Sequence, residues 1–201
     1  MSSWKTVQPN NGSILITDGV TTAGVKGTTP AAGSVLITEA QMGPFVRTTF
    51  TLNKARMTVT DGAGSGSHGS LLLYTCPAAA VSFLGARQDY TAFAEGAALT
   101  GAAGDAAFEI GVGTTAIAAA ADGTLGNGVN ENVGQAVAVT LSGGTGIGTA
   151  VDGAKTTALN GTGTATALYL NWSGSAATID ATSTIDVTGT ISVLWAHMGD
   201  D

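Results

Sequence analysis

Charged and aromatic side chains are scarce in this chain. Charged residues make up 10% of its 201 residues, and aromatic residues make up 5%. The chain therefore has few groups for acid–base, nucleophilic or metal chemistry, and each buried residue contributes less apolar area than in an ordinary core. Both shortages favour a scaffold or binding surface over an enzyme. We expect no catalytic residue, no cofactor and no metal ion.

Cysteine and long apolar runs are also nearly absent. Cys76 is the single cysteine, so no intramolecular disulfide can form, and we expect it to be a small core residue. The N-terminal residues contain no apolar signal segment, and the longest alanine-rich run, residues 116–121, is too short to cross a bilayer. We therefore expect synthesis in a cytoplasm without export, and no membrane partner.

Positive charge is missing from the second part of the chain. Residues 1–88 hold six basic and three acidic residues, whereas residues 89–201 hold one basic and eleven acidic residues, and the net charge is −7. Phosphate binding requires clustered lysine and arginine, so nucleic acid is not an expected partner. The basic first part could face an acidic protein surface, or its charges could simply be scattered in solvent.

Small residues are abundant in place of charged and aromatic ones, and one short segment of the chain is repeated. Alanine, threonine and glycine supply 95 of the 201 residues. Residues 12–18, Gly-Ser-Ile-Leu-Ile-Thr-Asp, recur as residues 33–39, Gly-Ser-Val-Leu-Ile-Thr-Glu. Each copy has the composition of a short strand. The two strands could lie at the edges of one domain, or each could add to the sheet of a neighbouring subunit.

Apolar and polar residues alternate in several later segments, which is the pattern of strands with one buried face. Predicted strands cover residues 45–52, 54–60, 70–75, 80–87, 106–112, 135–141, 166–172 and 185–195. Trp172 and Trp195 fall in phase with apolar neighbours, so we expect both in the core. Residues 92–104, 113–134 and 142–163 are rich in glycine and other small residues, and we expect loops there.

These short strands, spaced by roughly ten residues, predict an all-β protein. The expected architecture is an antiparallel β-sandwich, jelly-roll-like, with an extended N-terminal arm. The arm covers residues 1–44 with two short strands, and the sandwich domain covers residues 45–201. A right-handed β-solenoid is less favoured, because no repeat period persists along the chain.

One glycine motif resembles a nucleotide-binding fingerprint. Gly64, Gly66 and Gly69 have the G-x-G-x-x-G spacing, and Asp89 follows twenty residues later, where a dinucleotide fold places its ribose-binding acid. The fingerprint requires a helix directly after the glycines, and its N-terminus holds the pyrophosphate. Here the next apolar run is short and ends at Pro77. We therefore interpret the motif as a hairpin loop.

Two further polar groups are weak candidates for chemistry. Ser67, His68 and Asp61 contain the residue types of a catalytic triad, but no nucleophile elbow accompanies them. One later loop offers oxygen ligands, but its spacing is not that of a calcium-binding EF-hand. Its residues are Asp122, Asn127, Asn130 and Glu131. We expect ordinary turn and loop polarity at both places.

Four segments carry a resemblance to a known group of proteins. They are residues 54–61, Lys-Ala-Arg-Met-Thr-Val-Thr-Asp; residues 69–75, Gly-Ser-Leu-Leu-Leu-Tyr-Thr; residues 81–87, Val-Ser-Phe-Leu-Gly-Ala-Arg; and the end of the chain, from Val193 to Asp201. With them the chain resembles the decoration, or cement, proteins of tailed bacteriophage capsids, mainly over residues 45–90 and 165–201. The resemblance implies a sandwich or jelly-roll protein on the outside of the phage head that stabilises the lattice against packaged DNA.

The resemblance also implies partners, namely the major capsid protein and sister subunits in a homotrimer over capsomer junctions. We expect residues 1–50 to carry most of this contact, with the acidic remainder facing outward. Trp4 has no evident partner within the chain and is a candidate docking residue. The candidate contact residues are Trp4, Lys5, Lys26, Arg47, Lys54 and Arg56. The expected location is the virion, after synthesis in the host cytoplasm.

Other classes of protein remain open at this stage. A phage tail or fibre subunit would share this composition and style of folding. A bacterial surface adhesin or an ice-binding protein would fit the threonine, alanine and glycine content, but it should carry an export signal and a regular Thr-x-Thr ladder. A glycan-cleaving enzyme would need a pair of carboxylates about 5–9 Å apart.

Overall fold

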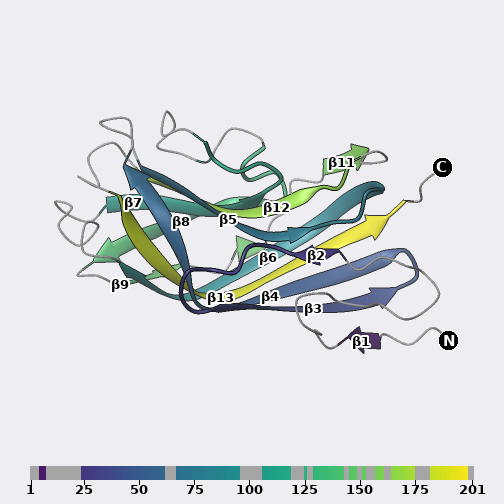
Figure 1. Cartoon of the computed structure of the whole chain (residues 1–201), viewed down its shortest axis with the longest axis horizontal. Coiled ribbons are helices and arrows are strands. Elements are labelled where there is room, and N and C mark those ends of the chain that lie inside the picture. Colours follow the sequence, from purple (N-terminus) through teal and green to yellow (C-terminus); the bar gives the residue numbers. More distant parts are fainter. Residues whose placement is uncertain are drawn as a thin grey trace.

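The computed structural model describes residues 5–7, 24–61, 67–95, 106–118, 125, 129–142, 145–148, 151–152, 157–160, 164–174 and 182–198. Within these ranges every regular element is a β-strand, and paired strands run antiparallel (Figure 1). The prediction of an all-β, antiparallel, sandwich-like fold is therefore confirmed. The described ranges contain no helix that is long and apolar enough to span a membrane.

The strands form one sheet that bends into two facing layers. In hydrogen-bonded order, the first layer consists of β1 (Lys5–Val7), β3 (Ser34–Met42), β4 (Phe45–Asp61), β13 (Ser183–His197) and β6 (Ala80–Glu95). The second consists of β9 (Thr145–Gly148), β8 (Gly134–Ser142), β7 (Ala106–Gly113), β12 (Ala167–Gly174), β5 (Ser67–Thr75) and β2 (Val25–Lys26). In Figure 1, β5, β12 and β7 lie above β6, β13, β4 and β3.

The two layers are joined at both sides and share one core. On one side β6 pairs with β9, and on the other the end of β4 pairs with the start of β5 at Thr60 and His68. Aromatic rings meet across the interior, with the Phe93 and Trp172 centroids 5.9 Å apart. Trp172 and Trp195 are both fully buried, so the prediction that they belong to the core is confirmed. Cys76 is buried as expected.

Strand β4 differs from the prediction of two separate strands. It runs unbroken from Phe45 to Asp61, but its buried positions switch phase in the middle. Even-numbered residues are buried up to Leu52, and odd-numbered residues are buried from Ala55 onward. The switch falls at Lys54, which has a φ of 49°, and the pairing with β13 slips there by one residue. This bulge keeps one face of a long strand on the core after an extra residue.

Other strands are longer than predicted, or lie in segments that were predicted to be loops. Strand β6 continues to Glu95, beyond the predicted end at residue 87. The expected loop at residues 142–163 contains β9, β10 (Val151–Asp152) and β11 (Thr157–Asn160). Strands β10 and β11 both pair with the edge of β6. Such short, small-residue strands bury little by themselves, and they are ordered by the hydrogen bonds of a long neighbour.

Of the two copies of the repeated segment near the N-terminus, the described residues include the second. The second copy forms most of β3, which pairs with β4 over its whole length from Ser34 to Met42. The first copy, residues 12–18, lies outside the described residues. Strand β1 pairs with the outer edge of β3 at Lys5 to Val7. Residues 34–42 are thus an integral strand of the first layer, and the domain division at residue 44 remains a prediction.

Candidate functional site

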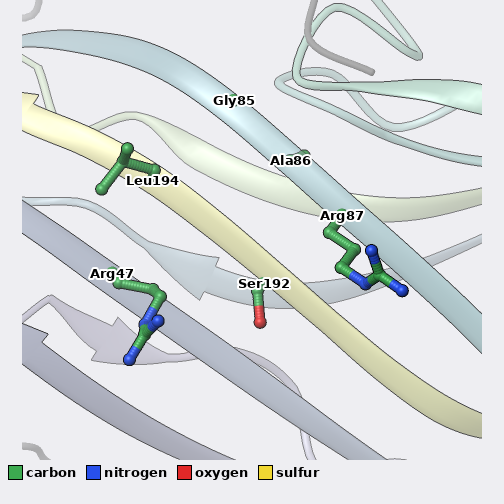
Figure 2. Close-up of a pocket in the computed structure, with 6 residues that line it drawn as sticks. All are labelled: Arg47, Gly85, Ala86, Arg87, Ser192 and Leu194. Atoms are coloured by element: carbon green, nitrogen blue, oxygen red, sulfur yellow. The ribbon is translucent and has the colours of Figure 1, made fainter. Parts of the chain in front are cut away.

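The outward face of β4, β13 and β6 carries the most distinctive surface of the described chain. The three strands are neighbours, with Leu194 of β13 opposite Arg47 of β4 and Gly85 of β6. A hollow of about 320 Å³ opens on this face. Its lining residues are Arg47, Gly85, Ala86, Arg87, Ser192 and Leu194, and we call it the arginine hollow (Figure 2).

A second bulge explains why a flat sheet has a hollow here. The register between β6 and β13 shifts between Leu194 and Trp195, and Leu84 has no opposite residue. Leu84 and Gly85 therefore face outward in succession, one with a large side chain and the next with none. Gly85 has no side chain to fill the space beside Leu194 and Arg87, and all three residues line the arginine hollow.

Three large apolar side chains of these strands are exposed near the hollow instead of lying in the core. Phe45 is 42% exposed, Leu84 is 38% exposed and Leu194 is 37% exposed. Phe45 lies two residues before Arg47 on β4, and Leu84 precedes Gly85 on β6, so each lies close in its strand to a residue that lines the hollow. An exposed apolar group beside charged residues is typical of a surface that another protein covers.

The predicted contact residues are dispersed rather than gathered in one place. Arg47 is exposed and lines the arginine hollow, whereas Lys54 is exposed near the middle of β4. Arg56 donates to both carboxylate oxygens of Asp186, at 2.7 and 2.8 Å. These hydrogen bonds and the negative charge of Asp186 raise the pKa of Arg56. Arg56 is therefore already paired with a carboxylate of its own chain.

The remaining predicted contact residues lie away from this face or outside the description. Lys26 is half-buried in β2, at the edge of the second layer. Lys5 lies in β1, and Trp4 is outside the described residues. Sequence reasoning missed Arg87, Ser192 and Leu194 as surface candidates. Arg87 carried a usable signal, since it is a charged residue at an outward position of a predicted strand.

The weak candidates for chemistry occupy ordinary structural positions where they are described. Ser67, His68 and Gly69 belong to β5, so the end of the glycine motif is strand and not hairpin loop as predicted, and no helix opens there as a nucleotide fold needs. Ser67 is 1% exposed, which places its hydroxyl out of reach of a substrate. Glu131 accepts a hydrogen bond from the Ala136 amide, and Asn130 donates to the Thr115 carbonyl. Asp122 and Asn127 are outside the described residues.

Potential metal ligands are dispersed in the described ranges. No group of three or more histidine, cysteine or acidic residues is close enough there to hold a metal ion.

A polar network lies inside the core, under the first layer. Glu39 of β3 is 1% exposed, and its Oε1 accepts hydrogen bonds from the Thr48 hydroxyl at 2.9 Å and the Tyr74 hydroxyl at 2.5 Å. Trp195 Nε1 donates to Thr48 Oγ1, and the Gly24 amide donates to the Tyr74 oxygen. The network thus links β3, β4 and β13 of one layer to β5 of the other and to the residues before β2.

Glu39 is an unusual member of this network. Its second oxygen, Oε2, is buried and has no hydrogen-bond partner among the described residues. Burial raises the pKa of Glu39, and the hydrogen bonds from Tyr74 and Thr48 oppose this increase only in part. The titratable groups that interact with it are Tyr74 and Cys76, which are acids themselves. The interior therefore favours the neutral carboxylic acid.

Comparison of the chain with protein-family models, with curated proteins and with solved structures found no match. The resemblance to phage decoration proteins therefore stays a prediction.

Proposed function

We propose that the chain is a virion structural protein, a capsid decoration or cement protein that binds the outside of a phage head and stabilises its lattice. In this proposal it acts as a homotrimer, and its partner is the major capsid protein. The observation that supports binding is the outward face of β4, β13 and β6, with the exposed Phe45, Leu84 and Leu194 around the arginine hollow.

The construction of the two layers suits a protein that works by contact. One continuous sheet holds the face, and its strands β4, β6 and β13 are among the longest in the chain. A face on long paired strands keeps its shape under load, because β4 and β13 are each hydrogen-bonded to a neighbouring strand along both edges. An interface gains most from apolar groups that are already fixed in place before binding.

The proposal also modifies the earlier expectation that residues 1–50 carry most of the contact. Strand β3 pairs fully with β4 and supplies Glu39 to the interior. Deleting residues 1–40 would therefore remove most of a sheet strand, and lost attachment would not identify a contact. A deletion of residues 1–23 leaves β3 and β4 intact and tests the N-terminal contribution cleanly.

The test is attachment to phage heads that lack this protein, measured by co-sedimentation with heads of the phage that encodes the chain. We expect saturable binding and a sedimenting mass of three chains for the free protein. Leu194→Asp should weaken binding by more than about tenfold, because it places a charge against an apolar partner. Val129→Asp is the matched control, since Val129 is also exposed, at 50%, but lies before β8 of the other layer.

Each result has a definite meaning. Failure of the unaltered protein to bind heads would refute the decoration function. Electron microscopy that locates it on tails or fibres would instead support the alternative of a tail subunit. Equal binding by Leu194→Asp and Val129→Asp would leave the function in place but remove this face as the contact surface.

A further inference from the structure

Two guanidinium groups from different strands reach the same hollow. Arg47 comes from β4 and Arg87 from β6, and β13 lies between them. Neighbouring strands are about 4.8 Å apart, so the two strands that carry the arginines are roughly 10 Å apart. Figure 2 shows Arg47 and Arg87 on either side of Ser192. A single anionic group above Ser192 can therefore be approached from both sides.

The hollow has room for a side chain and has no acid in its lining. Arg47 and Arg87 are the charged members of its six lining residues. Its volume is about 320 Å³, whereas a water molecule takes up about 30 Å³ of the liquid. The Ser192 hydroxyl lies at the floor, 3.1 Å from Thr49 Oγ1, and adds a polar group between the arginines.

We propose that the arginine hollow binds a carboxylate side chain of a partner protein, with apolar residues on either side of that acid in the partner. The planar guanidinium group matches a carboxylate through two parallel hydrogen bonds. Phe45, Leu84 and Leu194 at the border would cover the apolar neighbours of the acid. Only the identification of the partner as a major capsid protein rests on the proposed function.

The surroundings favour a protein acid over a phosphate polymer. The chain as a whole has a net charge of −7, which repels nucleic acid at longer range. Two arginines bordered by large apolar side chains are also a poor match for a run of phosphates. Arg47 and Arg87 each interact with other groups of the chain, so an incoming carboxylate joins or replaces those contacts.

The first experiment needs no phage head. Isotope-labelled protein is titrated with the blocked peptide Leu-Glu-Leu, with its Leu-Gln-Leu analogue and with inorganic phosphate, and binding is followed by NMR at the amides of Gly85 and Ser192. We expect the glutamate peptide to bind at least about tenfold more tightly than the glutamine peptide. Arg47→Gln and Arg87→Gln should each weaken it by a similar factor, whereas Lys54→Gln on β4 should not.

Arg47→Lys and Arg87→Lys keep the charge and the packing, so they guard against a folding defect. Both should bind the glutamate peptide less tightly than the unaltered protein, because lysine lacks the two-pronged donor. Equal affinity for the two peptides, or unchanged affinity in Arg47→Gln and Arg87→Gln, would overturn the proposal. Stronger shifts with phosphate than with the glutamate peptide would overturn it as well and would indicate a phosphate site.

The second experiment applies the same variants to phage heads. Arg47→Gln should attach at least about tenfold more weakly than Lys54→Gln. If the glutamate peptide binds but the unaltered protein does not attach to heads, the decoration function is wrong and the carboxylate site stands. If heads bind all variants equally, the hollow is not part of the contact with the capsid.

Discussion

Replacing Glu39 with glutamine should make the fold more stable than the unaltered protein as the pH rises. Glu39 is 1% exposed, and burial raises its pKa above the ordinary value of 4.5 for a glutamate side chain in water. Unfolding releases this carboxyl into water, where it ionises near pH 4.5. Keeping it protonated in the folded state therefore costs free energy at any higher pH. Glutamine does not ionise, so Glu39→Gln does not carry this cost.

The sign and size follow from proton linkage. Below about pH 4.5 both states hold the proton, so Glu39 imposes no penalty there. From that pH upward the unfolded state loses its proton first, and stability falls by about 1.4 kcal/mol per pH unit until the pH passes the raised folded pKa. The advantage of Glu39→Gln should grow at this rate and then become constant. The pH at which it levels off measures the folded pKa.

The assay is urea unfolding of both proteins between pH 4 and pH 8, with the difference in unfolding free energy plotted against pH. Other groups titrate equally in both proteins, so they cancel in the difference. Glu39→Ala serves as the control. Its unfolding free energy should follow the same pH trend as that of Glu39→Gln but be lower by about 2–4 kcal/mol at each pH, because Thr48 and Tyr74 lose their shared acceptor. A difference that is flat with pH, or that falls as pH rises, would refute the reasoning.

Three further outcomes are expected. Gly27→Ala should lower the unfolding free energy by about 1–3 kcal/mol, because the added Cβ would lie 1.9 Å from a carbonyl oxygen of β5. The Cys76 thiol is buried, which raises its pKa, so a thiol reagent should modify it only as fast as the chain opens. Trp195→Phe should cost about 1 kcal/mol more than Trp172→Phe in urea unfolding, since Trp195 Nε1 donates to Thr48 and Trp172 Nε1 has no acceptor among the described residues.

Each of these outcomes has a clear counter-result. Full stability of Gly27→Ala would mean that the backbone at Gly27, directly after β2, does not lie against β5 as described. Rapid labelling of Cys76 at low reagent concentration, without any urea dependence, would place the thiol at the surface. Equal losses for the two tryptophan variants would show that the hydrogen bond of Trp195 contributes nothing beyond packing.

The strand class of this chain was predictable because its signal is local. In β13 every second residue from Ile185 to Trp195 turns to the core. The period of two belongs to the extended backbone itself, so it can be seen without knowing any partner strand. The short strands β9, β10 and β11 gave no such signal, because pairing to β6 and β8 orders them.

The buried position of Glu39 was not predictable from its own segment. The repeated segment at residues 12–18 and 33–39 indicated a strand with an acid at its end, and an acid at a strand end is usually exposed. Its partners come from elsewhere in the chain: Thr48 from the neighbouring strand and Tyr74 from the opposite layer. Only the packing of the layers makes this carboxyl an interior group.

The sequence alone determined that this protein is built of antiparallel strands, poor in reactive groups, with Trp172 and Trp195 inside. The tertiary structure decided where its surface is special. Arg47 and Arg87 are distant along the chain and become neighbours of one hollow only because β13, from the far end of the chain, lies between their strands. Side-chain alternation depends on the backbone of one strand, whereas a hollow depends on strand order and on bulges that no single strand encodes.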